Sequence, residues 1–160
     1  MYDCIRYSSP LGVLTVRADY ENLSALVIEG QKYSGYHLAG EGQERETPVL
    51  RSARLWLDRY FEGKNPDIAL LPLAPKGTAF QKRVWKALLD IPYGKTVSYG
   101  EIAKFVGSSA RAVGSAVGHN PLSVIIPCHR VLSSDGKLTG YAGGLENKEK
   151  LLKLERGVPI

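Results

Sequence analysis

The sequence has few cysteines and no long apolar run, and each shortage excludes a class of protein. Only Cys4 and Cys128 occur among its 160 residues, too few for a disulfide framework or a four-cysteine zinc site. No apolar stretch approaches the roughly 18 residues of a membrane span, and the N-terminus lacks the basic-then-apolar pattern of a secretory signal. We therefore expect a compact cytoplasmic protein with no membrane partner, in which chemistry by a single reduced thiol stays open.

Charge is unevenly distributed along the chain. Residues 1–75 carry 8 Lys and Arg against 10 Asp and Glu, a net charge of −2. Residues 76–160 carry 13 basic and 6 acidic side chains, a net charge of +7, so the excess of +5 comes from the second half. A basic surface favours a polyanionic partner such as nucleic acid, although many basic surfaces bind nothing.

The first half reads as a small sheet followed by a helix. Residues 2–7, 11–16 and 23–28 are short β-rich segments separated by turns, which predicts an antiparallel meander. Thr47 as N-cap and Pro48 at the first helical position predict a helix that Gly63 ends. The apolar face expected for this helix consists of Leu50, Ala53, Leu57 and Phe61.

Prolines mark the boundary between two predicted domains. Residues 64–77 contain Pro66, Pro72 and Pro75, which predict an extended connector. We expect an N-terminal α/β domain over residues 1–75 and a mostly helical domain over residues 76–160. The predicted fold class is therefore a two-domain α/β protein.

Helix start signals recur through the second half. Residues 78–81 and 98–101 each have the pattern of a capping box. The first predicts a helix whose buried face holds Phe80, Val84, Ala87, Leu88 and Ile91, and the second a short helix with Ile102, Phe105 and Val106.

The second of these helices is predicted to be half of a helix-turn-helix. Gly107 closes it and Ser108 is able to cap another helix at once, over about residues 109–117. That helix is built from small residues, with Arg111 as its only long side chain, so its backbone is able to approach a nucleic-acid groove closely. Short helix pairs are also common in proteins that bind no DNA.

A cysteine with strongly polar neighbours follows the helix-turn-helix. Asn120-Pro121 breaks the helix, and the apolar run over residues 122–126 suits a buried strand or extended segment that leads into Cys128 and His129. Nearby positive charge favours a thiolate nucleophile, although a core cysteine beside a backbone-bonded histidine is an equally simple reading. Adjacent side chains point to opposite faces of an extended chain, so a water would have to link the two.

The histidine also needs an orienting acceptor, and the last helix offers one. Leu151, Leu152 and Leu154 anchor that helix, and Glu155 lies in its final turn, where a carboxylate opposes the helix dipole. Such a position suggests another task for Glu155, although a surface glutamate is the simpler alternative.

Together these residues resemble the O6-alkylguanine-DNA alkyltransferases. Pro127-Cys128-His129-Arg130-Val131 looks like the acceptor-site signature of that family, and the resemblance covers residues 78–157, in the family's order. The other motifs that carry it are Ser98-Tyr99, Arg111-Ala112-Val113-Gly114, Asn120-Pro121, Tyr141-Ala142-Gly143-Gly144-Leu145 and Glu155.

The resemblance implies DNA repair by irreversible transfer of an alkyl group from O6-alkylguanine to Cys128. His129 is implied as its base through a water, Glu155 as the residue that orients His129, and Tyr99 as the proton donor to the departing guanine. The partner implied is double-stranded DNA, bound through the minor groove by a monomer that flips the damaged nucleotide out of the helix.

Further residues take roles in DNA and substrate binding by the same resemblance. Arg111 is implied to fill the vacated stack, Asn120 to brace the turn before the active site, and the carbonyls of Cys128 and Val131 to read the guanine amino group. The DNA-binding residues are Ser98, Tyr99, Arg111 and Ala112. The substrate pocket holds Asn120, Val131, Tyr141 and Ala142.

Three departures from the family's pattern bear on these expectations. The turn at residues 107–109 is shorter than in many relatives, and Ser123 stands where some relatives have proline, a position that bears on bulky alkyl groups. Some relatives bind zinc in the first domain with two cysteines and two histidines, whereas that half offers only Cys4 and His37 here. We expect no metal and no cofactor.

Two other functional classes are considered beside repair. A catalytically silent DNA-binding module that senses alkyl damage would share the fold but lack the acceptor cysteine, and Cys128 is present. A Cys-His hydrolase is the other class, for which the adjacent Cys128 and His129 are poorly arranged.

Overall fold

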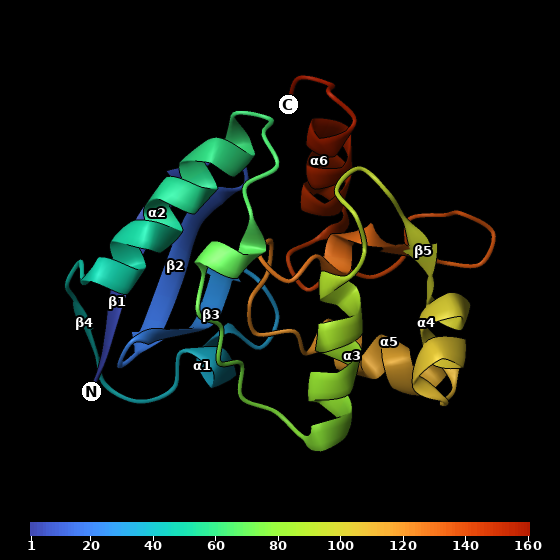
Figure 1. Ribbon diagram of the computed structural model, residues 1–160, viewed down its shortest axis with the longest axis horizontal. Coiled ribbons are helices and arrows are strands. Elements are labelled where there is room, and N and C mark those ends of the chain that lie inside the picture. Colours follow the sequence, from blue (N-terminus) through green and yellow to red (C-terminus); the bar gives the residue numbers. More distant parts are fainter.

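The computed structural model describes residues 1–160 and places a four-stranded sheet beside a group of helices (Figure 1). The predicted antiparallel meander is confirmed by β1 (Tyr2–Ser9), β2 (Gly12–Asp19) and β3 (Asn22–Ile28). A fourth strand that was not predicted, β4 (Gly42–Glu44), pairs parallel to β1, giving the order β3-β2-β1-β4. All three β4 residues are exposed, so hydrophobic periodicity gave no sign of this strand.

Helix α2 (Pro48–Phe61) covers one face of the sheet (Figure 1). Thr47 is the N-cap residue and Pro48 occupies the first turn, as predicted, although the Thr47 side chain makes no capping hydrogen bond. Its apolar face is wider than predicted. Leu50, Ala53, Leu57, Trp56 and Tyr60 are buried, and Phe61 is half-buried.

The connector after α2 runs back along the sheet. Leu23 and Pro72 share a backbone hydrogen bond of 2.8 Å, and Ala74 donates to Leu23 at the same distance. The predicted extended path is interrupted by one turn of 3-10 helix, η1 (Ile68–Leu70), which the Asp67 carboxylate caps. A short helix, α1 (Ser34–His37), follows β3 and was not predicted.

Helices α3 (Ala79–Leu89), α4 (Tyr99–Val106) and α5 (Ala110–Gly118) lie together on the side away from the sheet (Figure 1). Both hydrogen bonds of the first predicted capping box form, between Thr78 and Gln81. At the start of α4 only one forms, from Glu101 N to Ser98 Oγ at 3.0 Å. This bond still fixes the direction in which α4 leaves β5 (Val97–Ser98).

The tight turn between α4 and α5 confirms the predicted helix pair, with two differences. Gly107 has a left-handed φ of 70°, but the residue that caps α5 is Ser109 rather than Ser108. Phe105 is 75% exposed, because α4 rests on α3 and α5 through Ile102 and Ala103. Its ring therefore lies on the outside of the helix pair.

The segment before the cysteine is buried but is not a strand. Residues 122–126 are each at most 2% exposed, yet Val124 has a φ of +73° and Ile126 N donates to Leu122 O at 2.9 Å. The predicted strand is therefore replaced by a compact turn. It leads into η2 (Cys128–Arg130), then β6 (Val131–Leu132), which pairs with β5, and finally α6 (Leu145–Glu155).

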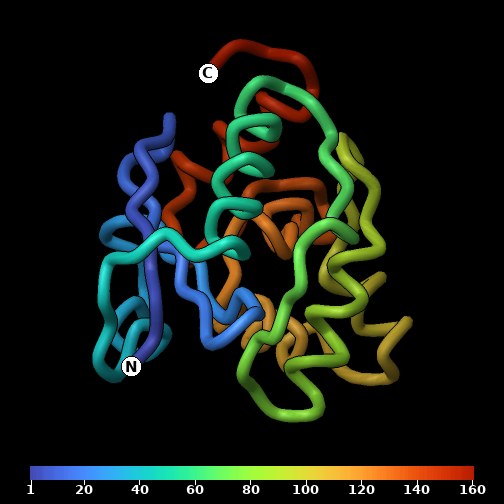
Figure 2. Tube along the Cα trace, turned by 60° about the vertical axis from the view of Figure 1, so that its left-hand side comes forward, coloured from blue at the N-terminus to red at the C-terminus, as the bar shows by residue number.

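One hydrophobic core of 33 buried residues runs through both halves of the chain. Leu26 of β3 forms a bridge with Leu122, so the sheet directly supports the segment before the cysteine. Figure 2 shows the last turns of α2 beside the red C-terminal helix α6. No helix combines the length and the apolar character that crossing a membrane requires.

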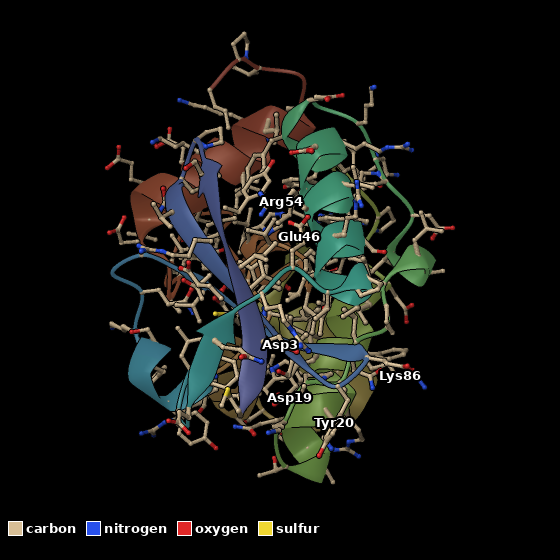
Figure 3. All side chains as sticks on the ribbon, turned by 90° about the vertical axis from the view of Figure 1, so that its left-hand side faces the viewer. Asp3, Asp19, Tyr20, Glu46, Arg54 and Lys86 are labelled. Atoms are coloured by element: carbon tan, nitrogen blue, oxygen red, sulfur yellow. The ribbon has the colours of Figure 1, made fainter.

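Several ion pairs lie on the outer face of the N-terminal half. Arg54 on α2 contacts Glu46 at 2.6 Å (Figure 3), and Arg45 contacts Asp3 at 3.2 Å. Because these basic side chains are already paired with carboxylates, this face offers less free positive charge to a polyanion than the helical half does.

Candidate active site

Cys128 is the first residue of η2 and lines a cavity of about 240 Å³. Its side chain is buried, and the whole residue is 4% exposed. Tyr99, Tyr141 and Ala142, predicted from the sequence, line the same cavity. The fold therefore brings four predicted site residues from three separate segments to one small space.

The N-terminal half completes the wall of this cavity. Tyr33 stacks on His119 with ring centroids 4.3 Å apart, and both residues line the cavity with Cys128. Lys32 N donates to the carbonyl of Ala142 at 3.1 Å, which ties the loop after β3 to the cavity-lining segment. Neither Tyr33 nor His119 belongs to the predicted pocket, because their pairing joins positions 86 residues apart.

His129 and Glu155 form a fully buried pair. His129 Nε2 lies 2.6 Å from Glu155 Oε2, and the two side chains are 0% and 1% exposed. An ionised carboxylate only accepts hydrogen bonds, so Nε2 carries the proton of the neutral ring. The other ring nitrogen, Nδ1, is buried and has no hydrogen-bond partner, and no hydrogen bond joins His129 to Cys128. Nδ1 is thus the free proton acceptor of the pair.

Glu155 collects more donors than the sequence suggested. Arg130 donates to it from Nε at 2.7 Å and from Nη2 at 3.1 Å, and the Gly94 backbone N–H donates at 3.1 Å. Tyr60 of α2 adds its hydroxyl at 2.6 Å. Arg130 is the neighbour of His129, so its charge was visible in the sequence. The part played by Tyr60 and Gly94 was not, because both contacts depend on tertiary packing.

The protonation states of the three residues follow from burial and charge. Burial raises the pKa of the Cys128 thiol, whereas the Asn120 amide and the Lys148 ammonium favour its thiolate. Burial also lowers the pKa of His129, against the opposing effect of Glu155. Burial alone would raise the pKa of Glu155, but its bonds to His129 and Arg130 hold it well below the ordinary value. At rest the site therefore contains a thiol, a neutral imidazole and a carboxylate.

Lys148 is a buried cation that was not predicted from the sequence. The residue is 0% exposed, and its Nζ donates to the carbonyls of Val131 at 2.6 Å, Thr139 at 2.8 Å and Gly140 at 3.1 Å. Burial lowers its pKa to about 8. Lys148 holds the segment after the cysteine against residues 139–140, and it places positive charge near the thiol. The sequence did contain one sign that Lys148 is buried: it lies three residues before Leu151, on the inner face of α6.

Asn120 holds the turn that presents the cysteine. Its Nδ2 donates to Ile126 O at 2.9 Å, and its Oδ1 accepts from Leu122 N at 3.0 Å. One side chain thus closes both ends of the buried turn before Cys128. The carbonyl of Val131, the other predicted pocket residue in this region, is already engaged by Lys148.

The predicted DNA-binding residues lie on α4 and α5, beside the cavity. Arg111 is exposed in the first turn of α5, and Ala112 and Ser98 are half-buried. Tyr99 connects the two regions, since it opens α4 and also reaches the cavity, where its hydroxyl donates to Thr139 O at 3.4 Å. Four residues of α5 line the cavity too, namely Gly114, Ser115, Val117 and Gly118, so the helix that carries Arg111 forms part of its wall.

A larger cavity lies apart from this chemistry. A cavity of about 740 Å³ is lined entirely by residues 1–49, and none of the predicted site residues is among them. No group of three or more His, Cys, Asp or Glu side chains is arranged to hold a metal ion.

Comparison with known proteins agrees with this arrangement. Residues 79–157 match the DNA-binding domain of 6-O-methylguanine DNA methyltransferase, and residues 4–75 match its ribonuclease-like domain. The chain is similar to methylated-DNA–protein-cysteine methyltransferases from Haemophilus influenzae (43% identity, 94% of this chain and 84% of the relative) and Methanosarcina barkeri (47% identity, 96% of each).

Among solved structures, the Mycobacterium tuberculosis OGT in complex with DNA superposes with a TM-score of 0.86. It is 42% identical, and the match covers 98% of this chain and 95% of that one. Both the sequence motifs and the whole fold are thus accounted for by one family. The chain belongs to the 6-O-methylguanine DNA methyltransferase family.

Proposed function

We propose that this chain repairs DNA by moving the alkyl group of O6-alkylguanine onto Cys128. Alkyl transfer from DNA to a protein cysteine is the activity that membership of the family brings. The observation that carries the assignment to Cys128 is its place in the cavity wall, directly before His129 in the chain, whose Nε2 lies 2.6 Å from the buried Glu155 Oε2. The only other cysteine, Cys4, lies on β1, outside this cavity.

Activation of the thiol runs through His129. A water between the Cys128 thiol and the unpartnered Nδ1 would satisfy that buried atom and carry the proton from sulfur to nitrogen. Glu155 stabilises the imidazolium that results, and the Lys148 ammonium favours the thiolate. Because burial opposes both charged forms, the ion pair forms chiefly when substrate fills the cavity. The sulfur's electron pair then bonds to the alkyl carbon as the bond from that carbon to O6 breaks, and the negative charge passes to guanine.

Departure of guanine needs a proton, and Tyr99 is the proposed donor. Its hydroxyl lies at the cavity and stays protonated, since burial raises its pKa. Protonation of a leaving group contributes roughly 10²–10⁴-fold to rates. The thioether left on Cys128 has no carbonyl for water to attack, so the proposed reaction ends after one transfer.

Residues 76–160 form the proposed DNA-binding and alkyl-acceptor domain, and residues 1–75 the domain that supports it. The small side chains of α5 and the exposed Arg111 suit insertion into the minor groove. A base cannot react inside the duplex, so the damaged nucleotide is flipped into the cavity and Arg111 fills the gap. We propose that a monomer carries out these steps in the cytoplasm.

Arg111→Ala is expected to slow repair of a lesion in duplex DNA by roughly 10- to 100-fold. Without Arg111 in the vacated stack, part of the few kcal/mol that flipping costs is no longer offset. Reaction with a free alkylguanine base, which needs no flipping, should keep its rate. Tyr99→Phe should slow both reactions, because guanine needs the proton in either case. Single-turnover rates at saturating protein separate these effects from weaker binding.

Lys104→Ala is the matched control for Arg111. It removes the same charge from an exposed position on α4, and should reduce DNA affinity without a selective loss of duplex repair. Equal losses for Arg111→Ala on duplex and free base would mean that Arg111 supports the fold, and its role in flipping would be withdrawn.

The proposed function itself is tested by the intact mass of the protein. After incubation with an excess of duplex containing O6-methylguanine, each molecule should gain the mass of one methyl group and then stop reacting. A protein that binds the duplex but gains no mass is a binding module. Repair of more than one lesion per molecule would show turnover and contradict the thioether.

A further inference from the structure

Tyr60, in the last turn of α2, is the residue through which the N-terminal half reaches the His129–Glu155 pair. The residue is 1% exposed, and its hydroxyl lies 2.6 Å from Glu155 Oε2 and 3.5 Å from His129 Nε2. Its ring is held by Trp56, stacked with centroids 5.5 Å apart, and by Phe61 and Tyr93 at its edges. The hydroxyl is therefore aimed at the His129–Glu155 pair by packing, with little freedom to turn elsewhere.

We infer that Tyr60 is a positioning residue for alkyl transfer, through which the N-terminal half sets the strength of His129 as a base. The inference rests on the proposed roles of Cys128 and His129. It gives the sheet-and-helix half a part in the chemistry, beyond its part in the shared core.

The direction of the Tyr60 hydrogen bond follows from the groups involved. Glu155 is ionised, so it accepts, and the Tyr60 hydroxyl must donate. Burial and the neighbouring carboxylate keep the pKa of Tyr60 well above its ordinary value, so the donor proton stays in place at any pH used for assay. Tyr60 thus behaves as a fixed neutral donor.

The consequence for His129 comes from sharing one oxygen. Glu155 Oε2 accepts from Tyr60, from His129 and, at 3.1 Å, from Arg130 Nη2. Each donor draws negative charge from that oxygen, so each weakens its hold on the proton of His129. Removing the Tyr60 hydroxyl leaves more charge on Oε2 facing His129. The imidazolium is then more stable, and His129 is a stronger base.

The other titratable and charged groups around the pair remain in place when Tyr60 changes. They come from the elements packed on either side, and none depends on the Tyr60 hydroxyl for its own position. These groups are Cys128 and Arg130 of η2, Tyr93 before β5, Tyr141 of the cavity wall and Lys148 of α6.

The test is the pH dependence of the single-turnover rate on duplex DNA with O6-methylguanine. The rate rises with pH as the His129 imidazolium loses its proton and becomes free to accept the proton of the thiol. In Tyr60→Phe, where the imidazolium is more stable, the midpoint of this rise should move to higher pH by roughly half to one unit, the size of effect that one hydrogen bond to a charged group supports. DNA affinity should stay unchanged. A midpoint that is unchanged, or that moves to lower pH, overturns the inference, even where the variant is less stable.

Tyr7→Phe provides a closely matched control. Tyr7 also donates to a carboxylate at 2.6 Å, that of Asp58 on the same helix, but it lies outside the cavity and away from His129. Its loss should lower stability by a comparable amount and leave the pH midpoint where it is in the unchanged protein. A shift as large as that of Tyr60→Phe would count against a specific role for Tyr60.

Replacing Tyr60 by 3-fluorotyrosine keeps the ring packing. This variant tests the role of the Tyr60 hydroxyl if Tyr60→Phe does not fold. The more acidic hydroxyl is a stronger donor, so the imidazolium is less stable and the midpoint should move the other way, to lower pH. If the midpoint does not move, the inference is overturned. The alkylated peptide of the unchanged protein is mapped in parallel, because an adduct elsewhere than Cys128 refutes the proposed function, whereas an adduct on Cys128 without these shifts refutes only the role of Tyr60.

Discussion

Replacing Cys128 by serine is expected to abolish alkyl transfer while DNA binding is retained. Serine nearly matches cysteine in size, so the buried turn and the cavity wall should keep their packing. A hydroxyl ionises far less readily than a thiol, and His129 at its lowered pKa is too weak a base to compensate. Mass measurement after incubation with methylated duplex should show no adduct, and affinity for the same duplex should equal that of the unchanged protein.

Cys4→Ser is the control for this loss. Cys4 is half-buried on β1, its Sγ lies 3.6 Å from Gln43 O, and burial and nearby carboxylates raise its pKa. Its replacement should leave the stoichiometry of transfer unchanged. An alkyl group found on a Cys4 peptide, or transfer that survives Cys128→Ser, would contradict the choice of acceptor.

Local chemistry predicted the elements whose causes are local. The three strands, the start of α2 at Pro48 and the capping box at Thr78 depend on residues within a few positions of one another, and they form as expected. The choice between Ser108 and Ser109 as the cap of α5 depends on the path of the turn after Gly107, which the residue types alone do not settle.

Where tertiary packing decides, prediction from the sequence was wrong or silent. Residues 122–126 have the composition of a buried strand, yet Asn120 bonds both ends of the segment and folds it into a turn. β4 forms from exposed residues because it can pair with the edge of β1. Propensity and periodicity describe neither a long-range side-chain bond nor a free sheet edge.

The active site, like the fold, contains some residues that the sequence predicted and others that only tertiary packing reveals. Cys128, His129 and Glu155 were selected from their types and positions, and the fold brings them together, with Tyr99, Tyr141 and Ala142 around the cavity. Lys148 was not among the predicted site residues, although it is buried against three carbonyls. A buried lysine and a partner from α2 both arise from the packing of the two halves, which one sequence does not display.

Glu155→Gln is expected to slow alkyl transfer, because it weakens His129 as a base. Residues that orient a reactive histidine commonly contribute about 10- to 100-fold, and a loss of this size in transfer rate is expected here. The neutral amide of this variant would no longer stabilise an imidazolium, so the thiolate forms less readily, while DNA affinity should not change because Glu155 is buried away from α5. Single-turnover rates over a range of pH, with separate affinity measurements, distinguish slower alkyl transfer from weaker DNA binding.

The same substitution should also destabilise the fold, because Arg130 would keep its buried charge without a carboxylate. Breaking a buried ion pair typically costs about 3–5 kcal/mol of unfolding free energy. Urea unfolding of both proteins at neutral pH measures this loss. The pKa of Glu155 is lowered in the folded state, so its contribution is complete above the ordinary pKa of a glutamate and is lost as pH falls through the folded value. The stability gap between the two proteins should therefore narrow in acid.

Glu149→Gln, on the exposed face of α6 and paired only with Lys153, should change neither rate nor stability by a comparable amount. A Glu155→Gln protein with normal rates across pH would place Glu155 among the groups that hold η2 to α6, without a part in activating Cys128.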